Sequence, residues 1–168
     1  MKNNSLESVR WDLSPFYKSI HDKKIASDIE TVKKLSQKML KNYKGKLNTK
    51  LNEAMQTLIE IDEITSKIFA YFYLMSSRDA DNQQIKKQMS KASEDLSKYL
   101  STLSFFDIEL TKLSKQDYDK QLTSSDLLKK HKPYFDKIRA NAKHFLDEKV
   151  ETIVSKLSPF TSNEWDDM

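Results

Sequence analysis

The chain has 168 residues, with 29 basic and 25 acidic side chains, a formal net charge of +4, one glycine, three prolines and no cysteine. So little glycine and proline disfavours hairpin-rich β architecture, and the lack of cysteine excludes disulfides, thiolate metal ligands and a cysteine nucleophile. The length suits one domain with a real core. We therefore predict a single all-α domain over residues 1–168.

Neither an export signal nor a membrane span is evident in the sequence. The N-terminus has no apolar stretch, and the longest apolar run, residues 68–75, is far shorter than the ~20 residues that a helix needs to cross a bilayer. We expect a cytoplasmic protein with no membrane partner.

The first predicted element is an aromatic arm over residues 1–26. Ser14 is placed to cap a short helical turn that begins at Pro15. Three aromatic side chains are expected to dock the arm onto the rest of the fold: Trp11, Phe16 and Tyr17.

Three long helices are predicted next, over residues 27–45, 49–77 and 81–113. The first begins at a capping box of Ser27 and Glu30, and Gly45 is suited to a left-handed C-cap. Asn48 is a plausible cap for the second helix. Asp81, with Gln84 three residues on, resembles a capping box for the third.

The second and third helices have matching apolar seams. In the second, the seam comprises Leu51, Ala54, Leu58, Ile61, Thr65, Ile68, Phe72 and Met75; in the third, Ile85, Met89, Ala92, Leu96, Tyr99, Leu103, Phe106, Leu110 and Leu113. Because such narrow seams are buried only against other helices, we predict a central antiparallel hairpin within a bundle of long antiparallel helices.

Residues 68–75 are apolar on every side of the predicted second helix. A helix of this kind is normally surrounded, which predicts that the arm or the C-terminal helices cover it, including Phe69 and Tyr73. As an alternative, Tyr71 and Tyr73 would line a substrate cleft and face a channel.

Shorter helices are predicted over residues 115–160. Ser114 with Asp117 forms a start signal, Pro133 suits the first turn of a helix or a kink, and Asp147 is placed to cap a further helix. Another capping box, Thr161 with Glu164, is followed by only four residues. Because this capping signal is not followed by enough residues for a helix, we expect the chain to be a piece of a longer protein.

The lysines between Thr31 and Asn52 are accompanied by no acidic residue. Such a run would grip phosphates, and Tyr43 would stack on a base, but neither an aromatic platform nor a binding motif accompanies it. We favour a solvated helix face and expect no nucleic-acid partner.

Four segments together resemble the N-terminal region of the oligoendopeptidase F family, the thimet-type zinc oligopeptidases. They are Trp11-Asp-Leu-Ser-Pro-Phe-Tyr17, Tyr43-Lys-Gly-Lys-Leu47, Ile68-Phe-Ala-Tyr-Phe-Tyr-Leu74 and Leu103-Ser-Phe-Phe-Asp-Ile-Glu-Leu110. The resemblance implies an all-helical domain that forms one wall of a deep channel where short peptides are cut.

The family's catalytic signature, His-Glu-x-x-His, binds zinc through two histidines one helical turn apart. The histidines of this chain are His21, His131 and His144; none lies four residues from another and none precedes a glutamate. No catalytic or metal-binding residue is therefore assigned, and the resemblance implies zinc in the parent enzyme with none bound by this chain.

The resemblance therefore implies that the chain is the channel-wall domain of a zinc metalloendopeptidase that hydrolyses oligopeptides, and that it is inactive by itself. Its partners would be the catalytic domain of the same polypeptide and oligopeptide substrates, and the isolated piece would dimerise through the surface it normally buries. The alternative is a stand-alone helical interaction module that binds a protein or peptide partner.

Overall fold

The computed structural model describes residues 11–141 together with Val150 and Ile153. Over this part of the chain every regular element is helical, which confirms the all-α prediction. In order, the elements are α1 (Lys23–Asn42), α2 (Leu47–Arg78), α3 (Gln83–Leu100), the 3₁₀ turn η1 (Ser101–Leu103), α4 (Ser104–Lys112), α5 (Lys115–Ser124), α6 (Asp126–Lys130) and α7 (Lys132–Ala140).

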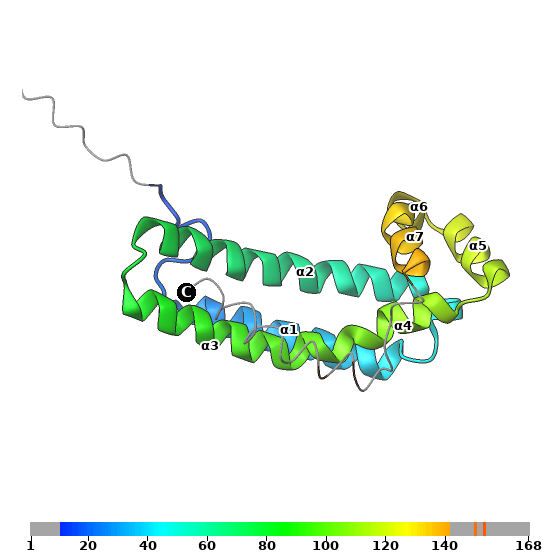
Figure 1. Ribbon diagram of the computed structural model, residues 1–168, viewed down its shortest axis with the longest axis horizontal. Coiled ribbons are helices and arrows are strands. Elements are labelled where there is room, and N and C mark those ends of the chain that lie inside the picture. Colours follow the sequence, from blue (N-terminus) through cyan, green and yellow to red (C-terminus); the bar gives the residue numbers. More distant parts are fainter. Residues whose placement is uncertain (1–10, 142–149, 151–152, 154–168) are drawn as a thin grey trace, which may run out of the picture.

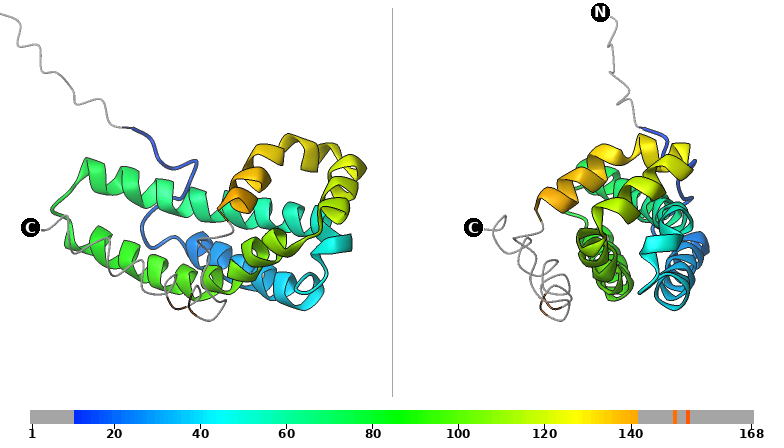
Figure 2. Two further views of the ribbon diagram at one scale, coloured as in Figure 1. Left: turned by 45° about the vertical axis from the view of Figure 1, so that its right-hand side comes forward. Right: turned by 90° about the vertical axis from the view of Figure 1, so that its right-hand side faces the viewer.

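Three long helices make an elongated bundle in which α1, α2 and α3 each pack against the other two (Figure 1). α2 runs antiparallel to both neighbours, so the predicted hairpin of the second and third helices is confirmed. The short helices α5, α6 and α7 gather at the end of the bundle where α1 turns into α2 (Figure 2). In the described residues, no helix combines the length and apolarity that a bilayer span requires.

One apolar core runs through the bundle and into the short helices. Burial of each large apolar side chain contributes roughly 1.5–3 kcal/mol to folding. The largest fully buried side chains are Tyr17, Met39, Leu47, Leu51, Ile61, Ile68, Tyr71, Phe72, Leu96, Phe105, Phe106 and Phe135.

The prediction of one continuous helix over residues 81–113 is wrong, because η1 separates α3 from α4. Hydroxyls at the junction donate to backbone carbonyls three residues earlier: Ser101 to Lys98, Thr102 to Tyr99, and Ser104 to Ser101. Such side-chain bonds compete with the regular helical ladder. Both Phe105 and Phe106 are buried beyond the junction.

The first helix begins four residues before the predicted capping box. Asp22 is the N-cap, and its carboxylate accepts a hydrogen bond from the Lys24 backbone N–H at 2.9 Å. The earlier start adds the buried Ile25 to the apolar face. Ser27 lies inside α1, where its carbonyl accepts from the Thr31 hydroxyl.

Of the remaining predicted helix caps, some are confirmed and others are displaced by one residue or more. Asn82, rather than Asp81, caps α3 by accepting from the backbone N–H groups of Gln84 and Ile85. Ser114 caps α5 as predicted, through the backbone N–H of Asp117. Pro133 stands in the first turn of α7, whereas the expected caps at Asp147 and at residues 161–164 lie outside the described residues.

The turn between α1 and α2 depends on Gly45, whose φ of +77° confirms the predicted left-handed conformation. It is not the C-cap, however, because α1 already ends at Asn42 and Tyr43 caps it. The Gly45 backbone N–H donates to Glu109 Oε1 at 2.7 Å, which ties the turn to α4. α2 starts at Leu47, with non-helical dihedrals at Lys50, and Asn48 does not cap it: the Asn48 carbonyl accepts instead from the Gln121 side chain.

Replacing Gly45 by alanine is expected to lower the free energy of unfolding by about 1–2 kcal/mol, the cost of the left-handed conformation for an L-residue. A Cβ there meets nothing within 4 Å, so backbone strain is the only penalty. Urea unfolding measures the effect. Lys46→Ala, at an exposed neighbour with negative φ, is the control and should change stability by less than about 0.5 kcal/mol; equal stability of the two variants would contradict the argument.

Candidate functional site

The two tyrosines predicted to face a channel lie on different sides of α2. Tyr71 is only 1% exposed, whereas Tyr73 is 67% exposed. Side chains two residues apart on a helix point in directions that differ by roughly 200°. The arm that covers Tyr71 therefore leaves Tyr73 exposed to solvent. The prediction that residues 68–75 are surrounded on all sides is therefore wrong at Tyr73, while Phe69 is partly buried.

Tyr71 is held where the arm meets α2. Its ring makes edge contacts with Tyr17 of the arm, with centroids 5.1 Å apart, and with Phe72, at 5.5 Å. Aromatic pairs in this geometry add to the stability that burial provides. The arm is thus packed directly against the C-terminal half of α2.

A polar cluster fastens the same part of the arm. The Tyr17 hydroxyl donates to Asp28 Oδ2 at 2.8 Å, and Lys67 Nζ lies 2.9 Å from that oxygen. The Lys67 ammonium also stands 4.4 Å from the centre of the Tyr17 ring. Burial and the bond to Asp28 raise the pKa of Tyr17 far above its usual value, so the hydroxyl stays protonated and donates.

The anchors of the arm differ in part from those predicted. Tyr17 is buried and Phe16 packs against the core, but Trp11 is 67% exposed, and Leu13 is buried in its place. Asp12 organises the turn by accepting from the Ser14 backbone N–H at 2.9 Å, so the expected cap at Ser14 is also wrong. The turn directs Leu13 and Tyr17 inward and leaves Trp11 at the rim.

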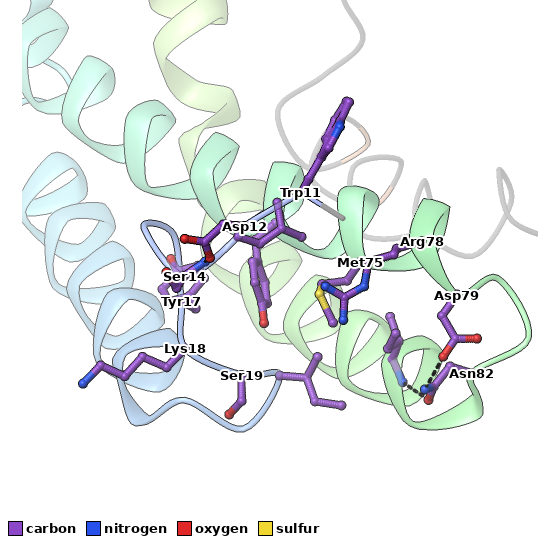
Figure 3. A pocket seen from close by; sticks show the side chains of 14 residues that line it. Trp11, Asp12, Ser14, Tyr17, Lys18, Ser19, Met75, Arg78, Asp79 and Asn82 are labelled. Carbon is purple, nitrogen blue, oxygen red and sulfur yellow. Dashed lines mark hydrogen bonds between the residues drawn. The ribbon is translucent and has the colours of Figure 1, made fainter. Parts of the chain in front are cut away.

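A cavity of about 520 Å³ opens between the arm, the end of α2 and the start of α3 (Figure 3). It lies at the opposite end of the bundle from α5–α7. This cavity could not be predicted from the sequence, because the arm is irregular and has no repeating apolar pattern that would indicate its path. Its lining includes Trp11, Leu13, Tyr17, Tyr71, Met75, Arg78 and Ile85.

Two polar groups of the cavity have no partner within the described part of the chain. The Tyr71 hydroxyl makes no hydrogen bond there, and Arg78 makes neither a hydrogen bond nor an ion pair. Burial raises the pKa of Tyr71, and the positive charge of Arg78 opposes that rise. Two acids of the lining are engaged locally, Asp12 with Ser14 and Asp79 with Asn82.

The described residues do not fit the zinc ion that the resemblance implies for the parent enzyme. Among them, no group of three histidine, cysteine, aspartate or glutamate side chains could hold a metal. His131 Nδ1 lies 2.9 Å from the Leu127 carbonyl, and His21 is in the arm. His144 is outside the described residues.

Part of the lysine run is engaged in local contacts. Lys33 pairs with Glu30 at 3.0 Å, Lys50 pairs with Glu53 at 2.8 Å, and Lys44 Nζ lies 5.9 Å from the centre of the Phe105 ring. These contacts along exposed helix positions support the interpretation of the run as a solvated face.

Comparisons with known proteins point to one kind of relative. The family model described as Oligopeptidase F matches residues 109–168. Group B oligopeptidase PepB of Streptococcus agalactiae is 29% identical over 70% of this chain and 20% of its own length. An oligoendopeptidase F homolog of Lactococcus lactis subsp. lactis is 23% identical over 92% of this chain and 26% of its own.

The fold has a solved counterpart. The crystal structure of oligoendopeptidase-F from Enterococcus faecium aligns with a TM-score of 0.72 and 19% identity, over 82% of this chain and 27% of that one. The chain therefore spans about a fifth to a quarter of the length of these relatives.

In sequence the chain is therefore similar to the N-terminal part of bacterial oligopeptidases, and its all-helical fold agrees with theirs. The predicted resemblance to the N-terminal region of the oligoendopeptidase F family is confirmed.

Proposed function

We propose that the chain forms the N-terminal domain of a cytoplasmic zinc metalloendopeptidase and acts as one wall of the channel in which oligopeptides are hydrolysed. The observation that carries the proposal is the alignment of nearly the whole chain with an oligoendopeptidase F homolog. The absence of cysteine suits the reducing cytoplasm.

The three long helices suit a wall better than a catalytic centre. They bury one continuous core and form a stiff, elongated body. The described residues include no metal cluster, so the zinc ligands and the glutamate that activates water would come from the rest of the polypeptide. The surface that we assign to the channel is the cavity beside Tyr71; Tyr73, exposed on the other side of α2, would then face away from it.

The test is peptide hydrolysis by the protein that the complete coding sequence specifies. We expect that sequence to continue past Met168 into a His-Glu-x-x-His helix, and its product to cleave an internally quenched oligopeptide. A chelator should abolish cleavage and added zinc should restore it. The isolated 168-residue chain, shown to be helical by circular dichroism, should neither cleave the peptide nor bind zinc.

A folded full-length product that leaves oligopeptides intact would contradict the proposal, as would cleavage by the isolated chain. A coding sequence that ends at Met168 would favour the stand-alone interaction module instead.

A further inference from the structure

The cavity beside the arm is lined by a side chain that is mostly buried but carries a hydrogen-bond donor, Tyr71. Tyr71 is almost fully buried, yet its hydroxyl has no hydrogen-bond partner in the described residues and the side chain lines the cavity. Among the described residues, the fully buried side-chain polar atoms without a partner are Ser36 Oγ and Thr65 Oγ1, so the Tyr71 hydroxyl is not sealed off but is reached from the cavity. Nearby Tyr17 donates its own hydroxyl to Asp28. A ligand oxygen in the cavity would accept from Tyr71 in the same way.

Arg78 adds a second donor to the same cavity. It ends α2, and its guanidinium extends beside Met75 (Figure 3). Both Arg78 and Tyr71 line this cavity, and the positive charge of Arg78 opposes the rise that burial causes in the pKa of Tyr71. A guanidinium offers a planar fork of donors that matches a carboxylate. The Tyr71 hydroxyl and the Arg78 guanidinium together therefore suit the two oxygens of a carboxylate.

The other charged side chains that line the cavity favour a ligand with a single negative charge. Asp12 and Asp79 offset Lys18 and Arg78, so the lining has no net formal charge. Both acids repel any anion, but they repel a dianion such as phosphate about twice as strongly as a carboxylate, whose single charge Arg78 alone neutralises.

Apolar groups complete the lining. Leu13 and Ile85 are buried around the cavity, and Met75 packs partly buried against the core. Trp11 offers an exposed aromatic surface at the rim. A ligand with an apolar group next to its carboxylate would therefore use both parts of the site.

We propose that this cavity binds the terminal carboxylate of a short peptide, with Arg78 and Tyr71 donating to its oxygens and the apolar lining contacting the last side chain. The choice of a peptide rests on the proposed function; the carboxylate chemistry rests on the cavity itself.

Binding to the 168-residue chain tests the proposal. The probes are N-acetyl-Ala-Leu with a free carboxylate and the same compound as its C-terminal amide, titrated by calorimetry or by NMR. We expect the acid to bind and the amide to bind at least about tenfold more weakly, because the amide lacks the charge that Arg78 pairs with.

Variants assign the contacts. Arg78→Gln should weaken binding of the acid by at least about tenfold, and Arg78→Lys should weaken it less because the charge remains. Tyr71→Phe keeps the packed ring and should cost a few-fold. Lys87→Gln is the control: it removes one positive charge, as Arg78→Gln does, but at an exposed position of α3 outside the cavity, so it should leave affinity unchanged.

Acid and amide that bind equally, no binding of the acid at about 10 mM, or full affinity in Arg78→Gln would each overturn the proposal. Acetate serves as a competitor: weak competition supports a peptide end, and competition equal to that of the peptide overturns the peptide assignment in favour of small carboxylates. None of these measurements requires catalysis, so failure here is distinct from failure of the full-length product to cleave peptides.

Discussion

Phe135→Ala is expected to lower the free energy of unfolding by about 3–5 kcal/mol, the usual cost of deleting a buried aromatic ring. Phe135 has 0% exposure and belongs to the same core cluster as the long helices, although it lies on the short helix α7. α7 packs against α4 and α6. Loss of the ring should therefore loosen the group of short helices, which urea unfolding followed by circular dichroism would measure.

Tyr73→Ala is the matched control for Phe135→Ala. It also deletes an aromatic ring from a helix, but this ring is largely in solvent, so the expected change is within about 0.5 kcal/mol. Phe135→Leu should restore most of the lost stability, because it refills much of the cavity. A Phe135→Ala variant as stable as Tyr73→Ala would show that α7 is not held by the core.

The long helices were predictable because their apolar seams are strong and are buried as expected. Ile61, Ile68 and Phe72 of α2 and Leu96 of α3 are all nearly inaccessible to solvent. Helix ends were harder to place, because neighbouring residues compete as caps. Asp22 and Asn82 each outcompete a plausible signal, Ser27 in one case and Asp81 in the other. The break at Ser101 depends on hydroxyls that also occur harmlessly inside helices.

The candidate site was only half predictable. Apolar composition singled out Tyr71 and Tyr73, but it did not reveal which side of α2 the arm would cover. That side depends on long-range contacts, such as the bonds that Tyr17 and Lys67 make to Asp28. Nothing in the sequence distinguishes Arg78 as a binding residue, since an arginine at the end of a helix normally complements the helix dipole. That it has no hydrogen-bond or ion-pair partner among the described residues becomes evident only in three dimensions.

Asp28→Ala is expected to cost about 2 kcal/mol, because one carboxylate serves two partners. Its removal leaves the Tyr17 hydroxyl buried without an acceptor and the Lys67 ammonium without its counter-ion. The cost of breaking a fully buried pair is higher, and we reduce it here because Asp28 and Lys67 retain some contact with water. Thermal or urea unfolding measures the loss. Affinity for N-acetyl-Ala-Leu should fall with it, since Tyr17 lines the cavity.

Glu30→Ala provides the comparison on the same helix. Glu30 pairs with Lys33 at 3.0 Å, but both side chains are exposed, so the expected loss is at most about 0.5 kcal/mol. A double-mutant cycle separates the contacts further: Tyr17→Phe should cost about 1 kcal/mol in the wild-type chain and much less once Asp28 is alanine. Additive losses, or an Asp28→Ala variant no weaker than Glu30→Ala, would show that the carboxylate does not hold the arm. The arm would then owe its position to the packing of its apolar and aromatic side chains, Leu13, Phe16 and Tyr17 among them.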